Sequence, residues 1–207
     1  MSIGAPQNDI APPLVRGFVS ESTLYLLRLF AASFLLRYYP VFMSSPNSFA
    51  QFLQEFRDTI AGATTRLRDI TPEESRRASA EENWALIEIL GHLVDSAANN
   101  HQRFVRAQFT DDLVFPGYEQ DGWVSAQKYR DESWSDLIQL WNSYNLHLVH
   151  LASVIPADVL TKPRAKHSLD KIAFKLVPQH EPATLEYLIR DYLDHLRHHL
   201  NQIFAES

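Results

Sequence analysis

Four segments of the chain repeat apolar residues at every third or fourth position, which is the spacing of one helix face. They cover residues 48–67, 84–109, 133–155 and 185–204. Strand-like alternation is rare, and the 207 residues include only 6 glycines. Amphipathic helices of about 20 residues bury their apolar faces best against one another. The sequence therefore predicts an all-α fold, a four-helix bundle.

Local signals mark several helix ends. Thr71 followed by Pro72 and Glu74 predicts a short helical turn, because Thr caps it and Pro suits its first position. Ser133 is a candidate N-cap, with Asp136 near the positive end of the helix dipole. Residues 157–181 form a second long connection, to which we assign no secondary structure from the sequence. The apolar stripes are predicted to include Leu90 and Leu93 in the second helix, and Leu137, Leu140 and Trp141 in the third.

Composition excludes several classes of function. The net charge is −6, from 19 basic and 25 acidic residues, which argues against a nucleic-acid-binding surface. The chain has no cysteine, so it has neither disulfides nor thiolate ligands, and we expect a cytoplasmic location. It has 9 histidines, which makes imidazole the ligand to look for.

The first 43 residues differ from the rest. Their apolar stretch is interrupted by Arg28 and Arg37, and the clean run of eight residues between them is shorter than a membrane span of about 20. The residues after the run do not resemble a signal-peptide cleavage site. We predict an irregular or loosely attached N-terminal extension at 1–43 and a bundle domain at 44–207. We hypothesise that Met43 is the natural start.

The length of one connection predicts the topology. Residues 110–132 form a 23-residue link between the second and third helices, far longer than antiparallel neighbours need. Such a link fits a crossover that returns the chain to its starting level. The second and third helices then run parallel, and the bundle is up-down-down-up.

Three histidines fit this topology. His195 and His199 lie one turn apart on the last helix, so one metal ion can bind both. They are centred about 10 Å from the end of that helix, and His92 lies about 12 Å from the start of the second. The second and last helices are antiparallel in this bundle, so the heights match. His92 is predicted at the flank of its stripe. Chance pairing or hydrogen-bonded boundary histidines are the alternative.

The crossover ends at the same level and is expected to wall the site. Glu119 and Trp134 belong to this predicted wall, and Arg103 or Arg197 are candidates for binding an acidic substrate. The alternative for each is ordinary packing or a solvated surface position. The principal candidates for orienting a ligand or binding substrate are Asp95, Asp191, Tyr118, Gln120, Asp121 and Trp123.

Three imidazoles leave a coordination position open, as in catalytic sites. The ligand type suits zinc, nickel, iron or manganese. Such an ion activates water or polarises a carbonyl, and it also stabilises the thiolate of a small-molecule thiol. No catalytic residue follows from the sequence beyond these ligands.

Two motifs resemble the DinB-like superfamily, and most closely its YfiT-like branch of metal-dependent hydrolases. They are Glu88–Phe104, which contains His92, and Asp194–Ile203 near the end of the chain. The resemblance covers residues 48–204. It implies an up-down-down-up bundle with metal ligands at the positions of His92, His195 and His199, and His198 as a non-ligand. It also implies a homodimer and a small-molecule substrate.

Three functions remain open from the sequence. The first is a metal-dependent hydrolase acting on a small molecule. The second is a transferase or isomerase that uses a low-molecular-weight thiol, as some members of the superfamily do. The third is a non-catalytic stress or ligand-binding bundle stabilised by metal.

Overall fold

The computed structural model describes Met1 and residues 48–78 and 84–205. Within this part of the chain there is no β-strand, and no helix is long and apolar enough to cross a membrane. The boundary at residue 43 and the start at Met43 lie outside the described residues and stay predictions. Four α-helices of 21 residues dominate: α2 (Phe49–Asp69), α4 (Leu86–Arg106), α6 (Trp134–Val154) and α9 (Leu185–Ala205).

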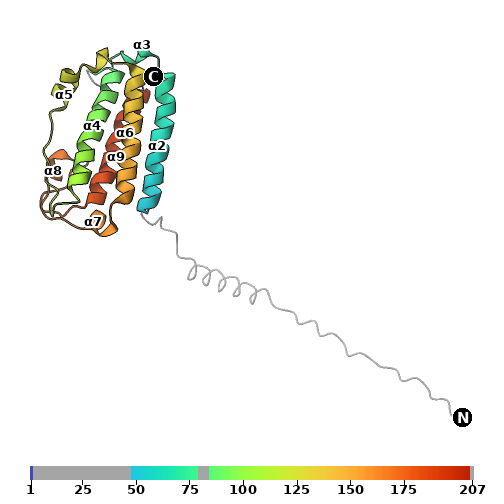
Figure 1. The fold of residues 1–207 in the computed structure, drawn as a ribbon, viewed down its shortest axis with the longest axis vertical. Coiled ribbons are helices and arrows are strands. Elements are labelled where there is room, and N and C mark those ends of the chain that lie inside the picture. Colours follow the sequence, from blue (N-terminus) through green and yellow to red (C-terminus); the bar gives the residue numbers. More distant parts are fainter. Residues whose placement is uncertain (2–47, 79–83, 206–207) are drawn as a thin grey trace, which may run out of the picture. The chain divides into compact units, whose positions relative to one another are not determined.

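The helices form the predicted up-down-down-up bundle. In Figure 1, α2 and α9 run in one direction and α4 and α6 run in the other. α4 packs against α6 and α9, and α2 packs against the same two helices. At one corner the Trp134 indole N–H, at the start of α6, donates to the carbonyls of Leu67 and Ile70, which lie at the end of α2. The fold class predicted from the sequence is confirmed.

The helices begin where the sequence places their caps. Thr71 and Glu74 form a capping box at the start of the short helix α3 (Pro72–Ser75). The Ser133 hydroxyl accepts the Asp136 N–H at the start of α6. In both cases a side chain satisfies a backbone group that the first helical turn leaves without a partner.

The most deeply buried helix is α4. Between Leu86 and Ala97 only Glu88 is not buried, because α6, α9 and the crossover cover this half of the helix. His92 is therefore fully buried rather than at the flank of the apolar stripe. The prediction for α6 is wrong at Leu140, which is 46% exposed. The buried face of α6 contains Ile138 in addition to the predicted Leu137 and Trp141.

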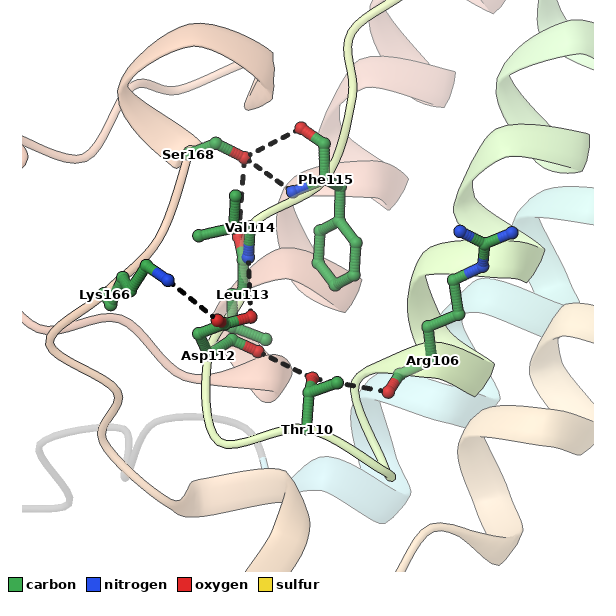
Figure 2. Close-up of polar contacts among 8 residues, drawn as sticks. All are labelled: Arg106, Thr110, Asp112, Leu113, Val114, Phe115, Lys166 and Ser168. Carbon is green, nitrogen blue, oxygen red and sulfur yellow. Dashed lines mark hydrogen bonds and ion pairs between the residues drawn. The ribbon is translucent and has the colours of Figure 1, made fainter.

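Both long connections contain short helices and hold each other in place. The crossover contains α5 (Gln120–Gln127) and the 3₁₀ turn η1 (Tyr129–Asp131), and the link before α9 contains α7 (Ala157–Thr161) and α8 (Leu169–Ile172). Figure 2 shows the two links meeting around Leu113, Phe115, Lys166 and Ser168.

Backbone hydrogen bonds join the two connections in this region. The Leu113 N–H donates to the Lys166 carbonyl at 2.9 Å, and the Ser168 N–H donates to the Leu113 carbonyl at 3.1 Å. The Ser168 hydroxyl accepts the Phe115 N–H at 3.0 Å. These contacts fix the two segments that continue toward the histidines.

The crossover also packs directly against the backbone of α4. The ring of Tyr129 lies so close to Gly91 that a Cβ there would be 2.2 Å from a ring carbon. The Tyr129 hydroxyl donates to the Asp95 carboxylate at 2.9 Å, one turn further along α4. Gly91 thus permits a close approach that any larger residue would block.

Candidate metal centre

Three histidines come together between α4 and α9. His92, His195 and His199 each offer a ring nitrogen, and these nitrogens lie within 4.8 Å of one another. The Nε2 atoms of His92 and His195 are 3.3 Å apart. His92 and His199 are buried, whereas His195 is partly exposed. The cluster is the only group of three or more such side chains in the described residues.

The direction of the helices explains the meeting. His92 lies six residues after the first residue of α4, and the centre of the His195–His199 pair lies eight residues before the last residue of α9. At about 1.5 Å per residue these heights are about 9 and 12 Å from the same end of an antiparallel pair. The crossover that makes α4 antiparallel to α9 thereby aligns the imidazoles.

The other ring nitrogens orient two of the imidazoles. His199 Nδ1 lies 2.6 Å from Gln202 Oε1, and His195 Nδ1 lies 3.4 Å from the Ser96 hydroxyl. Because an amide oxygen only accepts, His199 donates from Nδ1, and in the neutral ring its Nε2 carries the lone pair. His92 Nδ1 is buried and has no hydrogen-bond partner among the described residues.

Burial keeps two of the imidazoles, His92 and His195, neutral at physiological pH. Burial, reinforced by His199, lowers the pKa of His92 to about 3. Burial also holds the pKa of His195 well below its usual value, and the neighbouring His199 and His92 add to the effect. Neutral imidazole is the form that binds metal ions.

The arrangement fits a divalent metal ion. Two nitrogens about 2.0–2.1 Å from one tetrahedral ion are about 3.3 Å apart, which matches the separation of the His92 and His195 nitrogens. The outward Nδ1 contact of His199 with an amide oxygen is the kind of support that ligating histidines receive. A direct hydrogen bond between His92 and His195 would have a similar length and is the structural alternative.

A cavity of about 280 Å³ opens beside His195. Two of the candidate residues, Tyr118 and Gln120, line it, and so does the buried Arg103. It also contains residues that come from α4, both connections and α9: Ser96, Asn100, Gly117, Lys171, Ile172, Ala173, Phe174, Leu188, Asp191 and Tyr192.

The other aromatic and acidic candidates lie further from the histidines. Trp123 is 40% exposed and packs behind Tyr118, with ring centroids 4.8 Å apart. Asp121 is exposed and does not line the cavity. Glu119 caps the start of α5. Trp134 packs at the end of α2 and is absent from the cavity wall, so its predicted place in that wall is wrong.

The two candidate aspartates form hydrogen bonds with the connections that line the cavity, and not with the imidazoles. Asp95 accepts hydrogen bonds from Gln127 and Tyr129, both in the crossover. Asp191 accepts the backbone N–H groups of Phe174 and Lys175 at 2.8 and 2.7 Å. Both carboxylates thus position a connection against the bundle.

Sequence reasoning missed Ser96, Asn100 and Phe174. Ser96 and Asn100 follow His92 at successive intervals of four on α4, so helical spacing alone could have indicated them. Phe174 contacts His195 edge to face, with ring centroids 5.6 Å apart and ring planes at 70°. Nothing local marks Phe174, because the hydrogen bonds of the loop to Asp191 place it there.

Comparisons with known proteins agree with this fold. The model of the DinB superfamily matches residues 55–203. Among solved structures, YfiT from Bacillus subtilis is similar, with a TM-score of 0.63 and 17% sequence identity over 82% of this chain and 91% of that chain. YfiT is described as "a probable metal-dependent hydrolase with an unusual four-helix bundle topology". No curated protein matches the chain significantly.

Proposed function

This chain belongs to the DinB superfamily, and we propose that it is a metal-dependent hydrolase that acts on a small molecule. The observation that carries the proposal is the convergence of three imidazoles beside a cavity. His92, His195 and His199 would hold the ion. A divalent ion there would supply Lewis-acid activation of water or of a substrate carbonyl.

Residues of the cavity would bind and orient the substrate. Burial, with a smaller influence of Asp95, raises the pKa of Tyr118 to about 12, so its hydroxyl stays protonated and available as a donor. The Ser96 hydroxyl would keep the ring of His195 in place through Nδ1. The ring of Phe174 would limit the access of water to His195 from one side.

A thiol-dependent transferase is the second candidate. The site has only nitrogen donors, and the chain has no cysteine, so any thiol would have to come from a small molecule. The third candidate is a non-catalytic bundle in which the ion only stabilises the fold. The metal itself (zinc, nickel, iron or manganese), a homodimer and a cytoplasmic location remain part of the proposal.

Elemental analysis of the purified protein tests the metal site. We expect about one ion per chain, in line with one three-ligand site. Replacement of His92, His195 or His199 by Ala should remove it. His198→Ala is the matched control, because His198 is exposed and adjacent to His199 but outside the cluster. Unchanged metal content in His92→Ala would refute the assignment.

Turnover assays distinguish the three functions. Hydrolysis of a panel of small esters and amides that is lost in His92→Ala supports the hydrolase. Conjugation of a generic electrophile to a small thiol, lost in the same variant, supports the transferase instead. Metal-dependent stability without turnover in either assay supports the non-catalytic bundle.

A further inference from the structure

We propose that the cavity beside His195 binds the carboxylate group of the substrate, and that Arg103 is the residue that binds it. This inference rests on the function proposed above, because it names the class of molecule that the same site would take. It is carried by the burial of Arg103, by the lack of a carboxylate partner for its charge among the described residues, and by its connection to His195.

Arg103 carries a buried charge that has no ionic partner in the described part of the chain. Its side chain is 7% exposed and lines the cavity. Among the residues that the structure describes, no carboxylate lies within 4.0 Å of its guanidinium. Its guanidinium donates two long hydrogen bonds to neutral acceptors, at 3.4 Å to the Asn100 side-chain oxygen and at 3.3 Å to the Pro116 carbonyl. A buried guanidinium in this situation favours an anion.

The carboxylate that shares the cavity does not fill this role. Asp191 uses one oxygen to accept the Phe174 N–H and the other to accept the Lys175 N–H. Burial lowers the pKa of Arg103, and the opposing influence of Tyr118 and Asp191, which raises it, is smaller. Arg103 therefore keeps its capacity for a planar, two-pronged pair with a carboxylate.

A line of polar contacts connects Arg103 to the histidine cluster. Arg103 donates to the Asn100 side-chain oxygen, and the Asn100 amide donates to the Ser96 hydroxyl at 3.4 Å. The Ser96 hydroxyl in turn lies 3.4 Å from His195 Nδ1. The three side chains lie on one face of α4, because they are four and three residues apart.

This geometry gives the cavity two different ends. A carboxylate bound at Arg103 would leave the rest of a small molecule along Asn100 and Ser96, with its other end toward His195. Lys171 lies exposed at the same cavity and adds a second positive charge. A volume of about 280 Å³ is just below the range of about 300–1,000 Å³ that is usual for small-molecule sites, so the ligand would be small.

A binding measurement tests the inference without using catalysis. Glutarate and its uncharged diamide, glutaramide, are titrated into the full-length protein, as purified and after metal removal, and followed by NMR chemical shifts. We expect glutarate to bind both forms of the protein and to bind them more tightly than glutaramide. Binding of the two ligands with equal affinity would overturn the proposal, and this comparison requires no variant.

Variants then assign the effect to one residue. Arg103→Gln should weaken glutarate binding by about tenfold to a hundredfold, the range for losing hydrogen bonds to a charged group. Arg103→Lys keeps the positive charge but loses the two parallel N–H donors of the guanidinium. Its glutarate affinity should therefore lie between that of the native protein and that of Arg103→Gln. Arg106→Gln is the matched control, since Arg106 is exposed on the same helix and outside this cavity. Unchanged glutarate binding in a folded Arg103→Gln protein would refute the role of Arg103.

The two proposals fail in different ways. If glutarate binding to the metal-free protein does not depend on Arg103, the carboxylate site is refuted, whatever metal content elemental analysis finds. Absence of metal in the purified protein refutes the metal-dependent function and leaves the anion measurement unaffected.

Discussion

The Nε2 atoms of His92 and His195 lie 3.3 Å apart although 103 positions separate the two residues in the chain. One belongs to the most deeply buried helix and the other to the last helix of the bundle. An ion held by both would link α4 to α9 directly. The cluster is thus a candidate for stabilising the tertiary fold as well as for chemistry.

Metal should stabilise the native protein through this link. A ligand that binds only the folded state raises the free energy of unfolding by about 2.7 kcal/mol when its free concentration is about 100 times Kd. Denaturant unfolding with and without added zinc measures the difference. His92→Ala should abolish it, and His198→Ala should retain it. An equal effect of zinc on the His92→Ala protein would contradict the assignment.

Gln202 should raise the metal affinity without contacting the ion. Its side-chain oxygen lies 2.6 Å from His199 Nδ1 and fixes the orientation of that ring. Gln202→Leu should lower metal affinity by about tenfold to a hundredfold, the usual effect of losing such a partner. Competition with a chromophoric chelator gives the affinity. Asn201→Leu, at an exposed position of the same helix, should change nothing.

The free energy of unfolding of the metal-free protein should decrease as the pH falls below the ordinary pKa of histidine. The pKa of His92 is about 3 in the folded state, because of burial first and His199 second, against a value of 6.5 when unfolded. Between these two pH values, His92 is protonated in the unfolded chain and neutral in the folded chain. Stability is complete above pH 6.5 and falls by about 1.4 kcal/mol per pH unit between 6.5 and 3 for this one group.

His195 shifts in the same direction and adds to the slope. The measurement is the free energy of unfolding against pH for the native protein and for a His92→Gln, His195→Gln double variant. The native curve should fall more steeply in this interval. Parallel curves would show that the two histidines do not carry the effect.

Gly91→Ala should destabilise the protein. The added methyl group would stand 2.2 Å from the ring of Tyr129, which must then move. Overpacking of this kind costs about 1–3 kcal/mol. Gly62→Ala is the matched control: nothing lies within 4 Å of its Cβ, so it should stabilise helix α2 by about 0.5–1 kcal/mol.

A double-mutant cycle identifies the cause of the Gly91 effect. If the clash with Tyr129 is responsible, Gly91→Ala should cost much less in a Tyr129→Ala background. Additive effects of the two substitutions would point to another cause.

Asp191→Ala should loosen the segment that carries Phe174. The carboxylate accepts the amide hydrogens of Phe174 and Lys175, so its removal should speed their exchange with solvent by about tenfold or more. Hydrogen exchange followed by NMR measures both amides. Asp194→Ala removes only the exposed ion pair with the Lys175 side chain and should leave the two amides protected.

The elements that the sequence predicts are those fixed by local interactions. Ser133 caps its helix through the backbone of a residue three positions away, and Thr71 does the same. Helical spacing and loop length then place His92 at the height of His195. None of these inferences requires knowledge of a distant partner, and each agrees with the structure.

The features that escape the sequence depend on distant partners. Arg103 looks like a surface residue of an amphipathic helix, and it is buried only because Pro116 and the crossover cover it. The short helix α8 is held by the pairing of Ser168 with Leu113, 55 residues away. Leu140 follows the helical spacing of its neighbours yet lies on the exposed side of α6 among the described residues.

The position of the last helix has a consequence for biosynthesis. The first 184 residues contain one of the three clustered histidines, and the other two lie on α9. Before α9 docks, the chain presents a single imidazole of the cluster, too few to retain an ion. Metal uptake would therefore follow the docking of α9.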